Sequence, residues 1–120
     1  FGNYELAQKS KVQDFEHDGD LYKVKTFKEI TKLERNGMFV YESVPGTAVN
    51  HFRAAGEGVS FEVEAPSDAQ ITVELEADAE YRIYIDDTDV GTMKTNLGGK
   101  LVLSAELESA RKASIKIEKM

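Results

Sequence analysis

The chain has 120 residues, of which 41% are hydrophobic and 31% are charged, a composition typical of one soluble globular domain spanning residues 1–120. It contains no cysteine, which excludes disulfides and thiolate chemistry, and no apolar run of the roughly 20 residues that a membrane helix needs. The net charge is −7, and residues 61–120 carry 7 basic against 13 acidic side chains. We therefore expect neither nucleic acid nor a membrane as a partner.

The first predicted element is a hairpin. Residues 12–17 and 21–25 both resemble strands in their composition, and Asp18-Gly19 separates them. An Asp-Gly pair favours a tight turn because both central positions need a positive φ.

The apolar spacing changes in residues 26–37. Phe27, Ile30 and Leu33 recur every three residues, and Thr26 precedes Glu29 as in a helix capping box. This pattern predicts a short helix near residues 27–35 that ends at Asn36-Gly37. A second hairpin that turns at Asn36-Gly37 is the alternative.

The remaining chain reads as strands. Residues 38–43 are predicted to form a strand, and the alternating runs 59–65, 71–75, 81–85, 90–95, 101–107 and 115–117 follow, separated by turn residues. One face of these strands is apolar, and the other carries Glu, Thr, Arg and Tyr. The sequence therefore predicts a mostly β fold, an antiparallel β-sandwich of about ten strands, of jelly-roll or immunoglobulin-like type.

One short segment resembles a known corner motif. Leu75 and Tyr81 have the spacing of the tyrosine corner in fibronectin type III and related immunoglobulin-like sandwiches, although Ala77 stands where a proline is usual. The resemblance implies that the Tyr81 hydroxyl bonds back to the backbone near the start of the motif.

A wider resemblance covers nearly the whole chain. The segments Gly19–Val24, Asn36–Thr47 and Gly91–Lys100 are similar to a family of small, uncharacterised proteins of gut clostridia (Lachnospiraceae type). Some members of that family carry an automatic "endosialidase" label. The resemblance therefore implies a small carbohydrate-active enzyme as one function to consider.

The best candidate for a ligand site is the irregular stretch after the Pro45-Gly46 turn. Asn50, His51 and Arg53 follow it closely, and with Tyr41 they could bind a polar ligand if this stretch borders a concave surface. Since the chain has no Trp, a platform for a sugar ring would have to use an outward tyrosine such as Tyr84 or Tyr41.

Other site chemistries have little support. Asp86, Asp87 and Asp89 crowd one turn and form a weak calcium candidate; otherwise we expect no metal and no cofactor. Serine catalysis would need a histidine, and only His17 and His51 exist, without a Gly-x-Ser-x-Gly elbow.

These observations favour a non-catalytic binding or assembly module, whose partner is an unknown carbohydrate or protein. The alternatives are the small carbohydrate-active enzyme and an oligomeric structural protein of phage or surface-appendage type that pairs through strand edges. We expect a soluble protein that is either cytoplasmic or exported with its leader removed, since the sequence starts at Phe1.

Overall fold

The structure is a computed structural model that describes residues 1–8, 10–17, 19–55, 57–65, 67–106 and 112–120. In this part of the chain the strands are β1 (Ser10–His17), β2 (Asp20–Phe27), β3 (Ile30–Arg35), β4 (Met38–Val44), β5 (Ala48–Ala55), β6 (Gly58–Glu64), β7 (Ala69–Glu74), β8 (Glu80–Ile85), β9 (Thr88–Lys94), β10 (Lys100–Ala105) and β11 (Lys112–Lys119). The same residues contain no helix, and hence none that could cross a membrane.

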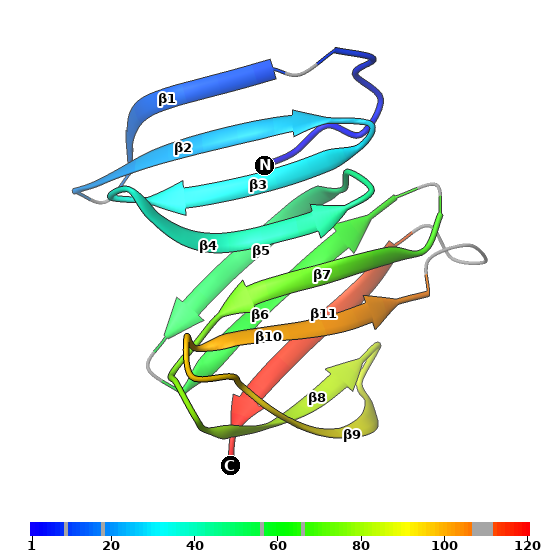
Figure 1. Cartoon of the computed structure of the whole chain (residues 1–120). Helices are drawn as coiled ribbons and strands as arrows, with labels where there is room; N and C mark the ends of the chain where they lie inside the picture. Colours follow the sequence, from blue (N-terminus) through cyan, green and yellow to red (C-terminus); the bar gives the residue numbers. More distant parts are fainter. Residues whose placement is uncertain (9, 18, 56, 66, 107–111) are drawn as a thin grey trace.

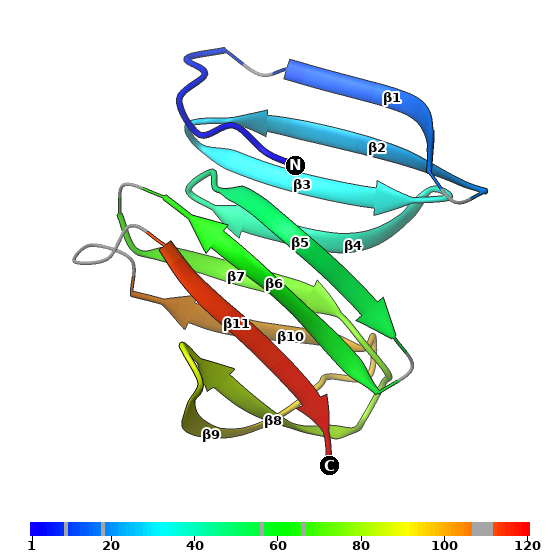
Figure 2. The same cartoon turned by 180° about the vertical axis from the view of Figure 1, so that it is seen from behind.

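The strands form two antiparallel sheets that pack against each other (Figure 1). Sheet A has the order β1-β2-β3-β4-β7-β10, and sheet B has the order β5-β6-β11-β8-β9. The chain passes between the sheets after β4, β6, β7, β9 and β10. Figure 2 shows from behind that β1 and β2 lie beyond β5, one of the two edge strands of sheet B. The predicted antiparallel β-sandwich is confirmed.

The core lies between the sheets and consists of the inward positions of alternating strands. Sheet A contributes Val24, Leu33, Tyr41, Ile71, Val73, Leu101 and Leu103, and sheet B contributes Val49, Val59, Phe61, Val63, Tyr81, Ile83, Ile115 and Ile117. Burying one such side chain stabilises the fold by roughly 1.5–3 kcal/mol. The alternation in residues 71–85 therefore predicted the inward side chains correctly.

The predicted helix near residues 27–35 is wrong, because this stretch forms a β-hairpin. Phe27 at the end of β2 pairs with Ile30 at the start of β3 across a two-residue turn. Paired residues share a face, so Phe27 and Ile30 lie on the outer face, whereas Leu33 lies three positions further on and points into the core. The turn thus produces the three-residue spacing that resembled a helix.

Two further turns follow the chemistry of their residues. Asn36 and Gly37 both have positive φ, 51° and 78°, and connect β3 to β4, which confirms the alternative hairpin at this position. Gly19 has φ 84°, and His17 pairs with Asp20, as expected for the first hairpin. The other residue of that turn, at position 18, lies outside the described residues.

The Leu75–Tyr81 segment carries the chain from sheet A to sheet B. The Tyr81 hydroxyl accepts a hydrogen bond from the backbone N–H of Glu76 at 3.1 Å, close to the start of the segment. This is the contact that the tyrosine-corner resemblance implied. The Tyr81 ring is buried, so the bond fixes the crossover from β7 to β8 against the core.

A cluster of buried hydroxyl groups lies beside the apolar core and was not predicted. Its members are Thr26, Thr31, Tyr41, Ser43 and Thr47. Thr31 is its centre: its Oγ1 lies 2.8 Å from Thr26 Oγ1, donates to Thr47 O at 2.8 Å, and accepts from Thr47 N at 3.0 Å. Thr47 Oγ1 lies 2.8 Å from both Tyr41 Oη and Ser43 Oγ. Burial raises the pKa of Tyr41 to about 12.

The cluster connects β2, β3 and β4 to the crossover that leads into sheet B. Gly46 in this crossover has no room for a side chain, because a Cβ would lie 2.0 Å from Phe27 O. Gly46 N donates to Lys28 O at 3.0 Å, on the same turn. Hydrogen bonds therefore hold the crossover both to the hydroxyl cluster and to the turn between β2 and β3. The close approach to Phe27 also requires glycine at position 46.

Residues 1–6 run along the opening between sheet A and β5. Phe1 exchanges two backbone hydrogen bonds with Val49, at 2.5 and 2.6 Å, and its ring packs edge-on against Tyr41 and Phe52. Asn3 N donates to Thr26 Oγ1 at 2.8 Å, which joins this segment to the hydroxyl cluster. Through the Phe1 ring, this segment adds an aromatic side chain to the core next to β5.

We expect Thr31→Val to lower the free energy of unfolding by about 2–3 kcal/mol, measured by urea denaturation. Valine has nearly the same shape, but it would leave the buried N–H and C=O of Thr47 without their partner. The control is Thr92→Val on exposed β9, which should change stability by less than about 0.5 kcal/mol. Equal effects of the two substitutions would contradict the structural role of the cluster.

Candidate functional site

The strand β5 contains a bulge that determines which of its side chains face outward. Val49 is buried, and the Phe52 ring stacks on Phe61 with centroids 5.6 Å apart, so both point into the core. Regular alternation would place residues 49 and 52 on opposite faces. The register against β6 shifts between Asn50 and Arg53, and His51 has φ 54°. His51 is the extra residue that lets both apolar side chains enter the core.

The bulge brings three of the predicted site residues to one surface. Asn50 pairs with Glu62 and Arg53 pairs with Ser60, so both lie on the outer face of sheet B, with His51 between them. All three side chains are exposed. A left-handed conformation at a residue other than glycine costs roughly 1–2 kcal/mol, and such strain concentrates at functional sites. The geometry therefore supports the predicted grouping of Asn50, His51 and Arg53.

Tyr41, the fourth predicted site residue, lies elsewhere. Its side chain is fully buried between the sheets, and its hydroxyl bonds to Thr47 in the hydroxyl cluster. It is therefore separated from the outer face of sheet B and cannot join the other three without unfolding. Tyr84, considered above as a platform for a sugar ring, does lie on that face.

The outer face of sheet B is hollowed beside the bulge, and we call this depression the outer hollow. Its volume is about 260 Å³, and it is lined by His51, Arg53, Ser60, Phe61, Glu62, Tyr84, Asp87, Ser114, Ile115 and Lys116. The cross-strand register explains the shape. Arg53 lies opposite Ser60, Ser60 opposite Lys116, and Lys116 opposite Tyr84. Small serines on the central strands thus lie between longer side chains on both sides.

Charged groups surround the outer hollow in a defined arrangement. Two nitrogen groups lie beside the Glu62 carboxylate: Lys112 Nζ is 3.1 Å from Oε2, and His51 Nδ1 is 3.4 Å from Oε1. The contact with Lys112 is the main reason why the pKa of Glu62 is lowered, and His51 adds to it. Arg53 forms no ion pair with any residue that the structure describes. Its exposed side chain lines the outer hollow.

Lys116 and Tyr84 form the opposite wall of the outer hollow. Lys116 Nζ lies 2.7 Å from Glu118 Oε1 and 5.9 Å from the centre of the Tyr84 ring. Glu118 raises the pKa of Lys116, so this amine stays protonated. The wall thus offers an aromatic face beside a hydrogen-bond donor. The signal that could have revealed it is the pair of small outward residues, Ser60 and Ser114, on strands whose other outward residues are long.

The calcium site considered at the turn between β8 and β9 is not assembled. Asp86 Oδ1 accepts from Ser114 N at 2.9 Å, and Asp89 bonds to Arg82 at 2.6 Å and to Gly91 N at 2.9 Å. Asp87 lines the outer hollow. Within the described ranges, no group of three or more His, Asp or Glu side chains is placed to hold a metal ion.

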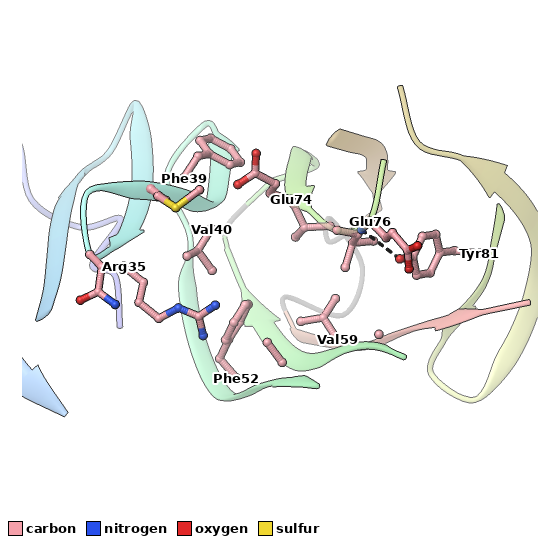
Figure 3. A pocket seen from close by; sticks show the side chains of 14 residues that line it. Arg35, Phe39, Val40, Phe52, Val59, Glu74, Glu76 and Tyr81 are labelled. Atoms are coloured by element: carbon pink, nitrogen blue, oxygen red, sulfur yellow. Dashed lines mark hydrogen bonds between the residues drawn. The ribbon is translucent and has the colours of Figure 1, made fainter. Parts of the chain in front are cut away.

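A second concavity lies between the sheets, and we call it the intersheet cleft. Its volume is about 710 Å³, and Figure 3 shows its walls. It is lined by Arg35, Asn36, Met38, Phe39, Val40, Phe52, Ala54, Gly58, Val59, Val73, Glu74, Leu75, Glu76 and Tyr81. No sequence pattern predicted this cleft, because it forms where strands distant in the sequence separate.

We expect His51→Gly to leave the free energy of unfolding unchanged or to raise it by up to about 1 kcal/mol. Glycine adopts the left-handed conformation without strain, which offsets its larger entropy in the unfolded chain. The matched control is Asn50→Gly at the neighbouring position, which should lose about 1 kcal/mol. Urea denaturation of both variants provides the comparison. If His51→Gly were the less stable variant, the strain at the bulge would be disproved.

Comparison of the chain with protein-family models, with curated proteins and with solved structures found no match. The similarity to the clostridial family and the endosialidase function that it implies therefore stay predictions.

Proposed function

We propose that the protein is a non-catalytic binding module that holds an oligosaccharide in the outer hollow of sheet B. The observation that carries this proposal is one cross-strand row, in which Ser60 and Lys116 separate the guanidinium of Arg53 from the aromatic ring of Tyr84. Arg53 forms no ion pair with the residues that the structure describes. Bound sugars commonly present a C–H face to an aromatic ring while their hydroxyl groups bond to charged side chains. Both kinds of group line the same depression here.

The polar groups of the outer hollow suit sugar hydroxyls. Arg53 and Lys116 are donors, and the Glu62 carboxylate is an acceptor, so both hydrogen-bonding functions of a hydroxyl can be satisfied. Hydrogen bonds to charged groups are about twice as strong as neutral ones. The hollow is shallow and smaller than most pockets for small molecules, which are about 300–1,000 Å³, so we expect weak binding that depends on several sugar units.

The electrostatics of the site favour binding over hydrolysis. A glycoside hydrolase needs one carboxyl group with a raised pKa, which protonates the leaving oxygen. Glu62 has the opposite property, because Lys112 and His51 lower its pKa and keep it ionised. This argues against the alternative of a small carbohydrate-active enzyme acting at this site.

The β9 edge of sheet B has features that oppose assembly through strand pairing. Every residue of β9 is exposed, but Asp89 pairs with Arg82 and Lys94 pairs with Asp78 at 3.1 Å. The register also shifts at this strand, and Gly91 has φ 118°. Charges and bulges on an edge hinder the addition of another strand. They argue against a strand-paired oligomer that forms through β9.

The proposal is tested by titrating neutral and acidic oligosaccharides into the ¹⁵N-labelled protein. We expect saturable shifts in the amide signals of Ser60, Glu62, Ser114 and Lys116. Arg53→Gln and Tyr84→Ala should each weaken binding about tenfold or more, since each loses a principal contact. Arg35→Gln, a matched exposed arginine in the intersheet cleft, should bind the same sugar with unchanged affinity.

Two results would overturn the proposal. One is the absence of any shift around the outer hollow with every oligosaccharide at millimolar concentration. The other is cleavage of an oligosaccharide by the native protein that Glu62→Gln abolishes, which would establish a hydrolase.

A further inference from the structure

The intersheet cleft arises because β4 and β7 separate at one end of sheet A. The two strands pair from Tyr41 to Val44 against Gln70 to Val73, and the pairing goes no further. The register between β3 and β4 also shifts next to this point, after Leu33. Residues 38–40 and 74–76 therefore form two sides of an opening, and sheet B provides its floor. Because sheet A is open here, the cleft reaches the inward-facing side chains of sheet B.

The interior of the cleft is apolar. Figure 3 shows Val40, Phe52 and Val59 around its centre, and Val73 and Leu75 also line it. Phe52 is one of the two residues that the β5 bulge turns inward. The same strand thus contributes Phe52 and Ala54 to the cleft and His51 and Arg53 to the outer hollow, on opposite faces of sheet B. The two concavities are therefore separate.

Two donor groups face the apolar interior. The Arg35 side chain extends toward Phe52 and Val40 (Figure 3), and its guanidinium forms no ion pair with the residues that the structure describes. The Tyr81 hydroxyl accepts from Glu76 N, so its own proton remains free to donate. An unpaired arginine beside an apolar surface favours a ligand that combines a carboxylate with a hydrocarbon body.

Two carboxylates also belong to the cleft and restrict where a negative group can lie. Glu76 pairs with Lys119, whereas Glu74 has no ion-pair partner within the described residues. Figure 3 shows Glu74 near Phe39, on the same side of the cleft as the β4 wall. A ligand carboxylate is therefore expected to lie at Arg35, with the hydrocarbon body directed toward Val59 and Tyr81.

We propose that the intersheet cleft is a second ligand site, independent of the outer hollow, that binds a small apolar monocarboxylate of the medium-chain fatty-acid type. The volume of about 710 Å³ lies within the range typical of small-molecule sites. Arg35 supplies the charge that selects the carboxylate, and the side chains of Val40, Phe52 and Val59 bury the chain. This inference does not depend on sugar binding.

The test uses decanoate below its micellar concentration, with decanol as the uncharged match and decyltrimethylammonium as the cationic match. Methyl NMR signals of Val40, Val59 and Val73 report occupancy. Decanoate should shift them saturably and bind more tightly than decanol, and decyltrimethylammonium should bind most weakly. Arg35→Gln should weaken decanoate about tenfold while leaving decanol unchanged. Ala54→Phe, which fills the cleft, should weaken both.

The matched control is Arg53→Gln, on the other face of β5, which should bind decanoate like the native protein. The inference is overturned if decanoate leaves the three valines unshifted, if Arg35→Gln binds decanoate unchanged, or if the ammonium compound binds most tightly. None of these results bears on sugar binding, which the outer hollow variants test separately.

Discussion

The structure depends on a conflict within β5 that a single extra residue resolves. The core requires Val49 and Phe52 on the same side of the strand, although they are three positions apart. His51 supplies the bulge that makes this possible, in a left-handed conformation. The same adjustment turns Asn50 and Arg53 to the outer face. Packing of the core and presentation of the polar site are therefore two consequences of one local distortion.

The hydroxyl cluster fixes the crossover that precedes β5. Thr31 binds Thr47 in the crossover that leads into β5, and Tyr41 joins this cluster to the aromatic packing around Phe52. Since buried polar groups cost free energy unless they are bonded, the cluster specifies one geometry for the crossover rather than several. No buried side-chain nitrogen or oxygen lacks a partner within the described residues. Because the crossover has one geometry, the start of β5 is fixed in position, and so is the part of the outer hollow that β5 forms.

The sequence was sufficient for the strands and for most inward residues, because alternation such as Ile71 and Val73 reports burial directly. It was misleading at Phe27 and Ile30, where a two-residue turn imitated helical spacing. The sequence pattern placed Tyr41 in a ligand site, because a tyrosine can lie either on the surface or in the core. It is buried here because its hydroxyl has a buried partner, Thr47. The cluster, the outer hollow and the intersheet cleft depend on cross-strand register, which a single sequence does not contain.

Position 51 is an insertion within an otherwise regular strand. Deleting His51 tests it most directly, since Val49 and Phe52 would stay inward and Asn50 and Arg53 outward in a regular register. We predict that this deletion variant unfolds cooperatively in urea, with a midpoint close to that of the native protein. Deleting Ser114 from β11, which pairs regularly on both sides, should prevent folding because neighbouring side chains would change faces. A deletion of His51 that abolished folding as well would contradict the account.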